Sequence, residues 1–300
     1  MVVLLLSPWL IGFAAFAAIP MALSLYYSFN HYDITTSPHW VGLANYKYMF
    51  GIDGPQDPYF LPSIKNTLYM IVLGLPLRIL FAMGTAMLLV RPRRGTNAYR
   101  TLFYMPSIAP AVGAALVFVY LFNPATGPVN QVLSHIPGIT PPLWFYDPTW
   151  AKPALIMLGL WGIGDAIVLY LAGLLNVPRH LYEAIDIEGA NRWQRFRYVT
   201  LPMLTPVILF TLIIGIIDGF QYFDQGYVAS YGAGGAQATL GSPQNSLLFY
   251  STWIYQNAFV NFTMGYASAL AWVLFIITMA LTALLLLSSR RWVHYGGGMS

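Results

Sequence analysis

Six long apolar runs constrain this chain more than any other feature, and they cover residues 2–27, 67–90, 102–122, 154–175, 203–223 and 262–288. The hydrocarbon core of a bilayer is crossed by about 20 mostly apolar residues in a helix, which is the length of each run. Only 8% of the residues are charged, against roughly a quarter in soluble domains. The sequence therefore predicts an all-α membrane protein with six transmembrane helices in a single domain over residues 1–300.

The first run also contains the small residues of a cleavage site, in "AAFAAIP". It has no basic segment before it and is too long for the apolar core of a signal peptide, so we expect a true span. Because no charged residue precedes the run, we expect that the natural chain can begin further upstream.

The basic residues predict the orientation. Ten of the fourteen lie in 91–100, in 176–200 and at 290–291, which share one side of the membrane if there are six spans. The positive-inside tendency makes that side cytoplasmic, with both termini inside a prokaryotic cell membrane. Nucleic acid is a poor partner for this chain, because the arginines flank spans and form no patch.

Three gaps lie on the external side. We expect short interfacial helices between turns in 28–66, and an ordered, proline-rich cap in 123–153. The glycine-rich segment 226–250 is predicted to be the most mobile of the three.

The longest polar segment, residues 176–202, lies between spans four and five on the cytoplasmic side. Pro178 suits a helix's first turn, and Gly189 suits a left-handed C-cap. Asn191 can cap a second helix with Gln194 as its capping-box partner. We therefore predict a helix, glycine, helix elbow, which ends at Pro202.

The spacing of five residues in this elbow resembles the EAA-loop signature of inner-membrane permease subunits of ABC importers: Glu183, Ala184, Gly189, Leu201 and Pro202. Two positions depart from the family pattern, because Ile185 stands for alanine and Val199 for isoleucine. Elsewhere "VGLANY", "LAGLLNVPRHLYEA" and "YQNAFVNFTMGYASALAW" resemble the sugar-importer branch, and within it the maltose-transporter-type first permease. The similarity covers essentially the whole chain, without the additional spans and large external domain of the maltose protein.

The resemblance implies a type I ABC importer permease for an oligosaccharide, a disaccharide or a related polyol. The elbow would be the coupling helix that docks into a cytoplasmic ATPase subunit, through Glu183, Ala184, Asp186, Glu188, Gly189 and Ala190. It also implies a second permease subunit, in a heterodimer or a homodimer, two ATPase subunits and an external substrate-binding protein. The chain has no Gly-Lys-Ser or Gly-Lys-Thr, so it lacks a P-loop and we expect no cofactor in it; ATP and Mg²⁺ would be held by the ATPase subunits.

Polar residues at membrane depth are costly and face a cavity or a partner helix. Arg78 is predicted to be neutralised by Asp165 or Asp218, and the sequence does not decide between them. A direct contact of Arg78 with the substrate is the alternative.

The substrate path is predicted from residues suited to sugars, which bind by carboxylate and amide hydrogen bonds and by aromatic stacking. Asp218, Gln221, Tyr222 and Gln225 have the spacing of one helical face, which lines either a cavity or a polar helix seam. The resemblance adds Trp161 in span four, with Asp165 one turn later. Asn257 is a further candidate, whereas Tyr266 is interpreted as a membrane-interface aromatic.

Two other function classes compete with the importer. An ion-coupled secondary transporter would use Arg78, Asp165 and Asp218 as a buried charge relay, but it would not need a patterned elbow. An intramembrane enzyme would need a catalytic pair or metal motif, and no span contains one.

Overall fold

The computed structural model describes residues 2–91, 94–234 and 238–294, which are predominantly helical. In chain order the elements are α1 (Val2–Phe13), η1 (Ala14–Ala18), α2 (Ile19–Ser28), β1 (Asn30–His31), β2 (His39–Trp40), α3 (Ala44–Phe50), α4 (Phe60–Tyr69), η2 (Met70–Gly74), α5 (Leu75–Leu89), α6 (Thr96–Tyr104), η3 (Met105–Ile108), α7 (Ala111–Leu121), α8 (Pro128–Ser134), η4 (Trp144–Tyr146), α9 (Pro148–Trp161), α10 (Gly164–Leu175), α11 (Arg179–Ile187), α12 (Arg192–Arg195), η5 (Phe196–Thr200), α13 (Leu201–Phe220), α14 (Asp224–Gly234), α15 (Tyr250–Tyr255), η7 (Gln256–Val260) and α16 (Met264–Ser289).

Four helices among the described residues are long and apolar enough to cross a membrane by themselves: Leu5–Ser28, Phe60–Leu89, Arg192–Phe220 and Met264–Ser289. Two more regions qualify only as bent pairs, Thr96–Ile108 with Ala111–Leu121 and Pro148–Trp161 with Gly164–Leu175. The described chain therefore holds four candidate spans, or up to six if each bent pair is one span, at the positions of the six apolar runs.

The run 102–122 does not form one straight helix, because its two halves meet at 97°. Ala109 and Pro110 are both extended at this break, with ψ of 136° and 135°. Proline has no N–H to donate and disfavours helical geometry in the residue before it, so the helix ends here. Hydrophobicity alone gave no sign of this bend.

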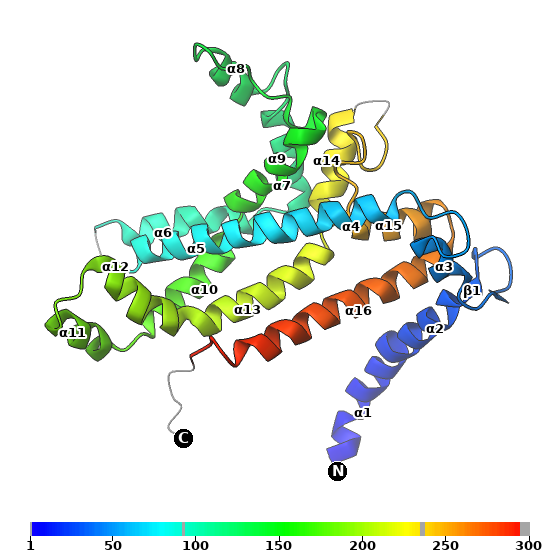
Figure 1. Ribbon diagram of the computed structural model, residues 1–300, viewed down its shortest axis with the longest axis horizontal. Coiled ribbons are helices and arrows are strands. Elements are labelled where there is room, and N and C mark those ends of the chain that lie inside the picture. The colour runs from blue at the N-terminus through cyan, green and yellow to red at the C-terminus, as the bar shows by residue number, and fades with distance from the viewer. Residues whose placement is uncertain (1, 92–93, 235–237, 295–300) are drawn as a thin grey trace.

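The long helices run side by side across the molecule (Figure 1). At one end lie α11, α12 and the start of α6, and we call this the elbow end. At the other end lie α3, α15 and the β1–β2 pair, whereas α8 projects away from the helices and α1 diverges from them.

The largest core cluster joins α5, α10 and α13, with Ile79, Tyr170 and Leu204 among its buried members. Small residues allow these helices to approach closely, as is usual between membrane helices. A Cβ at Gly215 would lie 2.2 Å from Leu75 Cδ1. The contact between α5 and α13 therefore depends on glycine.

The segment 28–66 contains the short helix that we expected, α3, and in addition the antiparallel β1–β2 pair. The interpretation of Tyr266 as an interface aromatic is wrong. Its side chain is 8% exposed and donates a 2.5 Å hydrogen bond to the carboxylate of Asp57. The sequence gives no sign of this contact, because the two residues are far apart along the chain.

The other two gaps also contain helices. Residues 123–147 contain α8 and η4, and Trp144 donates a 2.6 Å hydrogen bond from Nε1 to Asn130 Oδ1 across this cap. In 226–250, α14 covers the residues up to Gly234, and the mobility expected of this segment stays a prediction. Residues 235–237 lie outside the described residues.

Candidate functional site

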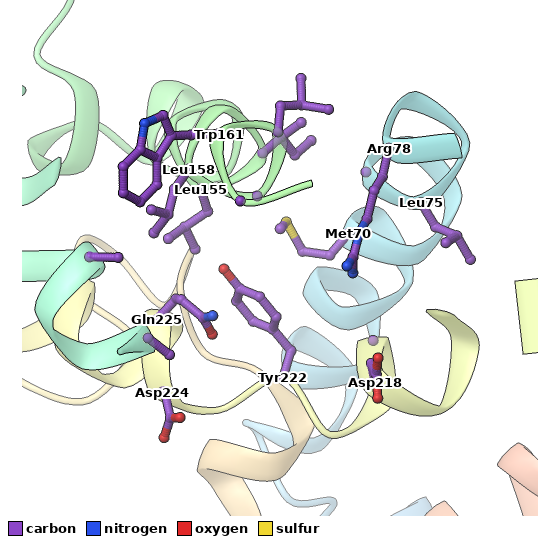
Figure 2. A pocket seen from close by; sticks show the side chains of 18 of the residues that line it. Met70, Leu75, Arg78, Leu155, Leu158, Trp161, Asp218, Tyr222, Asp224 and Gln225 are labelled. Atoms are coloured by element: carbon purple, nitrogen blue, oxygen red, sulfur yellow. The ribbon is translucent and has the colours of Figure 1, made fainter. Parts of the chain in front are cut away.

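A cavity of about 610 Å³ opens among four membrane helices (Figure 2). It is bounded by α5, by the break before α7, by the last turns of α9 and by the junction of α13 with α14. Its polar and aromatic lining consists of Arg78, Ser107, Trp161, Asp218, Gln221, Tyr222, Phe223, Asp224 and Gln225. Carboxylate, guanidinium, amide and aromatic groups therefore line one space at the middle of the bundle.

The four residues predicted to share a helical face do line this cavity, but not as one face. The helix α13 ends at Phe220, Gln221 is its C-cap, and α14 begins at Asp224. Only Asp218 of the four lies within α13, and in Figure 2 the hydroxyl of Tyr222 and the amide of Gln225 point into the space from the junction. The premise of a continuous helix was wrong, although the grouping itself is present.

Trp161 and Asp165 are separated by the break between α9 and α10, which bends the chain by 51°. Trp161 is the last residue of α9, lines the cavity and has its ring 5.7 Å from that of Phe118. Asp165 lies in the first turn of α10 and lines a second cavity of about 60 Å³. The two residues therefore face different spaces.

Arg78 pairs with Asp165, which decides the alternative that the sequence left open. The Nη2 atom of Arg78 lies 3.0 Å from Oδ1 and 2.8 Å from Oδ2 of Asp165. Asp218 lines both cavities, as Arg78 does, and forms no ion pair among the described residues. It interacts electrostatically with both members of the Arg78–Asp165 pair.

Asn257 lines neither of the two cavities. It is 5% exposed, lies in η7, and donates a 2.9 Å hydrogen bond from Nδ2 to the carbonyl of Trp253. Its Oδ1 accepts a 3.3 Å bond from Thr263 Oγ1. These hydrogen bonds tie Asn257 to the entry of α16, and its assignment to the substrate path stays a prediction.

The elbow at residues 176–202 has the local structure that the sequence predicts. Gly189 has φ of +76°, with its N–H bonded to the carbonyl of Asp186 at 3.1 Å and that of Ala190 bonded to the carbonyl of Ile185 at 3.2 Å. These two bonds form a Schellman C-cap for α11. Asn191 and Gln194 form the expected capping box, with bonds of 2.8 and 2.9 Å. Pro178 differs slightly from expectation, since it precedes α11 as its N-cap residue.

Side-chain contacts that the sequence does not predict hold the two helices of the elbow together. Arg195 on α12 lies 3.1 Å from the carboxylate of Asp186 on α11, and its guanidinium lies 4.9 Å from the ring of Tyr182. The Tyr182 hydroxyl is 3.1 Å from Thr200 Oγ1. No periodicity links these positions, so only the folded chain brings them together.

The outer surface of the elbow is open. Glu183, Ala184, Glu188 and Gly189 are exposed, Ala190 is half-buried, and Ile187 at the end of α11 is 86% exposed. The elbow therefore exposes an apolar side chain together with carboxylates on the same short helix. Among the described residues, no group of three or more His, Asp or Glu side chains could hold a metal ion.

Comparison with known proteins gives consistent matches over nearly the whole chain. Residues 74–294 match the family model described as "Binding-protein-dependent transport system inner membrane component". The probable ABC transporter permease protein YesP of Bacillus subtilis is 41% identical over 97% of this chain and 90% of its own length. The sulfoquinovosyl glycerol transport system permease protein SmoG of Agrobacterium fabrum is 33% identical over 95% and 88%.

Among solved structures, the chain is similar to a chain of a bacterial alginate ABC transporter in complex with an alginate pentasaccharide-bound periplasmic protein. The TM-score is 0.79, with 26% identity over 96% of this chain and 93% of that chain. Because the family model covers well over half of the residues, the chain belongs to the family of binding-protein-dependent transport system inner membrane components.

Proposed function

We propose that this chain is a permease subunit of an ATP-driven carbohydrate importer, and that it forms part of the path through the membrane. The observation that carries the proposal is the combination of a mid-bundle cavity with sugar-binding chemistry and a braced, exposed elbow on the same helices. The similarity to SmoG and to the alginate transporter chain supports a carbohydrate cargo, since both are named for carbohydrates.

The proposed topology has six spans, counting each bent pair as one, with the elbow and both termini in the cytoplasm. Ten of the fourteen basic residues then lie on the elbow side, as the positive-inside tendency requires. The gaps 28–66, 123–153 and 226–250 are external and receive the substrate-binding protein.

The elbow docks into one of two cytoplasmic ATPase subunits, with Ile187 entering the contact and Glu183 pairing with a basic side chain there. ATP and Mg²⁺ belong to those subunits. One elbow per chain requires a second permease subunit, which also completes the cavity.

The coupling role is tested by Glu183→Lys, compared with Glu183→Gln. Reversing a charge at a docked contact costs more than neutralising it, so we expect uptake to fall about tenfold or more for Glu183→Lys and less for Glu183→Gln. The measurements are sugar uptake and ATP hydrolysis by the reconstituted complex. Normal coupled uptake with Glu183→Lys would remove this residue from the contact.

The cavity role is tested by Trp161→Ala and Gln221→Ala. Losing a stacking surface or one amide hydrogen bond costs about 1–2 kcal/mol of binding, so the apparent affinity for sugar in uptake assays should change by about five- to thirtyfold. Assembly with the ATPase is the control and should persist. Unchanged uptake with every sugar tested would exclude both side chains from the path.

The secondary-transporter alternative is favoured by one observation, the Arg78–Asp165 pair at membrane depth. Uptake driven by a proton or sodium gradient, in a complex whose ATPase is inactive, would establish it. We expect no such uptake.

A further inference from the structure

Two cavities lie one behind the other along the bundle, and one wall separates them. Both the 610 Å³ cavity and the 60 Å³ cavity are lined by Leu75, Arg78, Gly215 and Asp218. The smaller one is completed by residues further toward the elbow end of α5 and α13, among them Ile79 and Thr211, and by residues of α10 such as Tyr170. These shared residues lie between the large cavity and the elbow end of α5 and α13.

Charged side chains form the polar part of the wall. Arg78 holds Asp165 through both carboxylate oxygens, whereas its Nε is buried without a hydrogen-bond partner among the described residues. Asp218 interacts electrostatically with Arg78, yet no described residue donates a hydrogen bond to its carboxylate. Arg78 therefore has one engaged carboxylate and a second one near it.

The connectivity places both carboxylates on the helices that flank the elbow. Asp165 lies in α10, which leads into α11, and Asp218 lies in α13, which continues without interruption from α12 and η5. Arg78 lies in α5, which is joined to α6 and not to the elbow. A displacement of the elbow therefore moves both carboxylates relative to the guanidinium.

We infer that Arg78 and Asp165 form the cytoplasmic gate of the cavity, and that movement of the elbow opens it by drawing Asp165 away while Asp218 receives Arg78. The inference rests on the proposed function, because it takes the elbow as the part that the ATPase moves. Exchange of partners keeps Arg78 paired throughout, which avoids an isolated charge at membrane depth. The bistable element is a single arginine between two carboxylates.

The gate is tested by thiol accessibility, since this sequence contains no cysteine. Thr211→Cys places a thiol in the small cavity beyond the wall, and Gly159→Cys places one in the large cavity, where a Cβ meets no heavy atom within 4 Å. The assembled complex is reconstituted in vesicles and treated from the external side with a membrane-impermeant thiol reagent. Labelling of this subunit is followed with and without ATP and Mg²⁺.

With the pair intact, Thr211→Cys should react slowly from outside. Adding Arg78→Gln should speed its labelling about tenfold or more, because one partner of the ion pair is lost. Asp165→Asn should do the same, whereas Arg78→Lys should retain part of the protection. Size-exclusion chromatography confirms that each variant is assembled, and Asp165→Asn provides a second route if Arg78→Gln does not assemble.

The outcomes separate the two proposals. If labelling of Gly159→Cys responds to ATP but neither Arg78→Gln nor Asp165→Asn changes the labelling of Thr211→Cys, the gate is overturned and the importer stands. If labelling of Gly159→Cys is indifferent to ATP in a complex that hydrolyses ATP, the cavity is not the ATP-coupled path, and the proposed function fails with it.

Discussion

Asp57 carries a carboxylate that is almost completely withdrawn from solvent, with 2% of the residue exposed. It accepts hydrogen bonds from Trp253 Nε1 at 2.7 Å, from the Tyr266 hydroxyl at 2.5 Å and from the backbone N–H of Tyr59 at 2.9 Å. Hydrogen bonds to charged groups contribute about 1.5–3 kcal/mol each, so this single residue attaches the segment 28–66 to α15 and α16.

Replacing Asp57 with Asn should lower the free energy of unfolding by about 1–3 kcal/mol, because the amide nitrogen then faces a donor and leaves it without an acceptor. Asp53→Asn is the matched control. Its ion pair with Lys47 is open to water, with side chains 73% and 51% exposed, and should contribute less than about 1 kcal/mol. Thermal unfolding of the purified complex measures the destabilisation that each of the two substitutions causes. Equal effects of the two substitutions would contradict the role of Asp57.

At the scale of an element, the elbow depends on one left-handed residue between the short helix α11 and the start of a long membrane-spanning helix. The helix α11 has nine residues and would not be stable alone in water, whereas α12 is the first turn of the continuous helix Arg192–Phe220. The Schellman cap at Gly189, the capping box at Asn191 and the contacts of Arg195 hold them at a defined angle. A fixed angle allows the elbow to transmit a displacement to the membrane helices on both sides.

The variants Gly189→Ala and Gly189→Asn test the effect of the left-handed backbone conformation at Gly189 apart from any steric effect of a side chain. A Cβ at Gly189 would meet no heavy atom within 4 Å, so the cost comes from φ of +76° alone. This conformation costs alanine about 1–2 kcal/mol, whereas asparagine adopts it more readily. We expect Gly189→Ala to raise the number of ATP molecules hydrolysed per sugar imported, and Gly189→Asn to do so less. Identical ratios for the two variants would show that the left-handed turn is not what couples the elbow.

At the scale of the whole molecule, much of the apolar surface is open. The apolar window of Leu5–Ser28 has none of its residues buried, and Phe16 is 87% exposed. In Figure 1 this helix diverges from the other long helices and lies close only to one end of α16. In a membrane, lipid or transmembrane helices of another subunit can cover such a surface.

The chain expressed with its ATPase but without a second permease should insert in the membrane and yet support no uptake, because it supplies one elbow and part of a cavity. Co-expression of the second permease should restore uptake, and the two should co-purify through a tag on either one. Full uptake without the second permease would instead indicate a homodimer of this chain.

The sequence by itself determined those features that depend on local contacts or on the bilayer. The apolar runs are required by the thickness of the membrane, and the C-cap at Gly189 and the capping box at Asn191 involve residues three to five apart, so that backbone geometry alone decides them.

Only the tertiary structure decided which distant side chains meet. Arg78 and Asp165 are 87 residues apart, and Asp57 and Tyr266 are 209 apart. The break at Pro110 and the end of α13 before Gln221 set where the cavity lies and which residues line it. Such contacts depend on how the helices pack across one another, and helical periodicity describes each helix only with respect to its own axis.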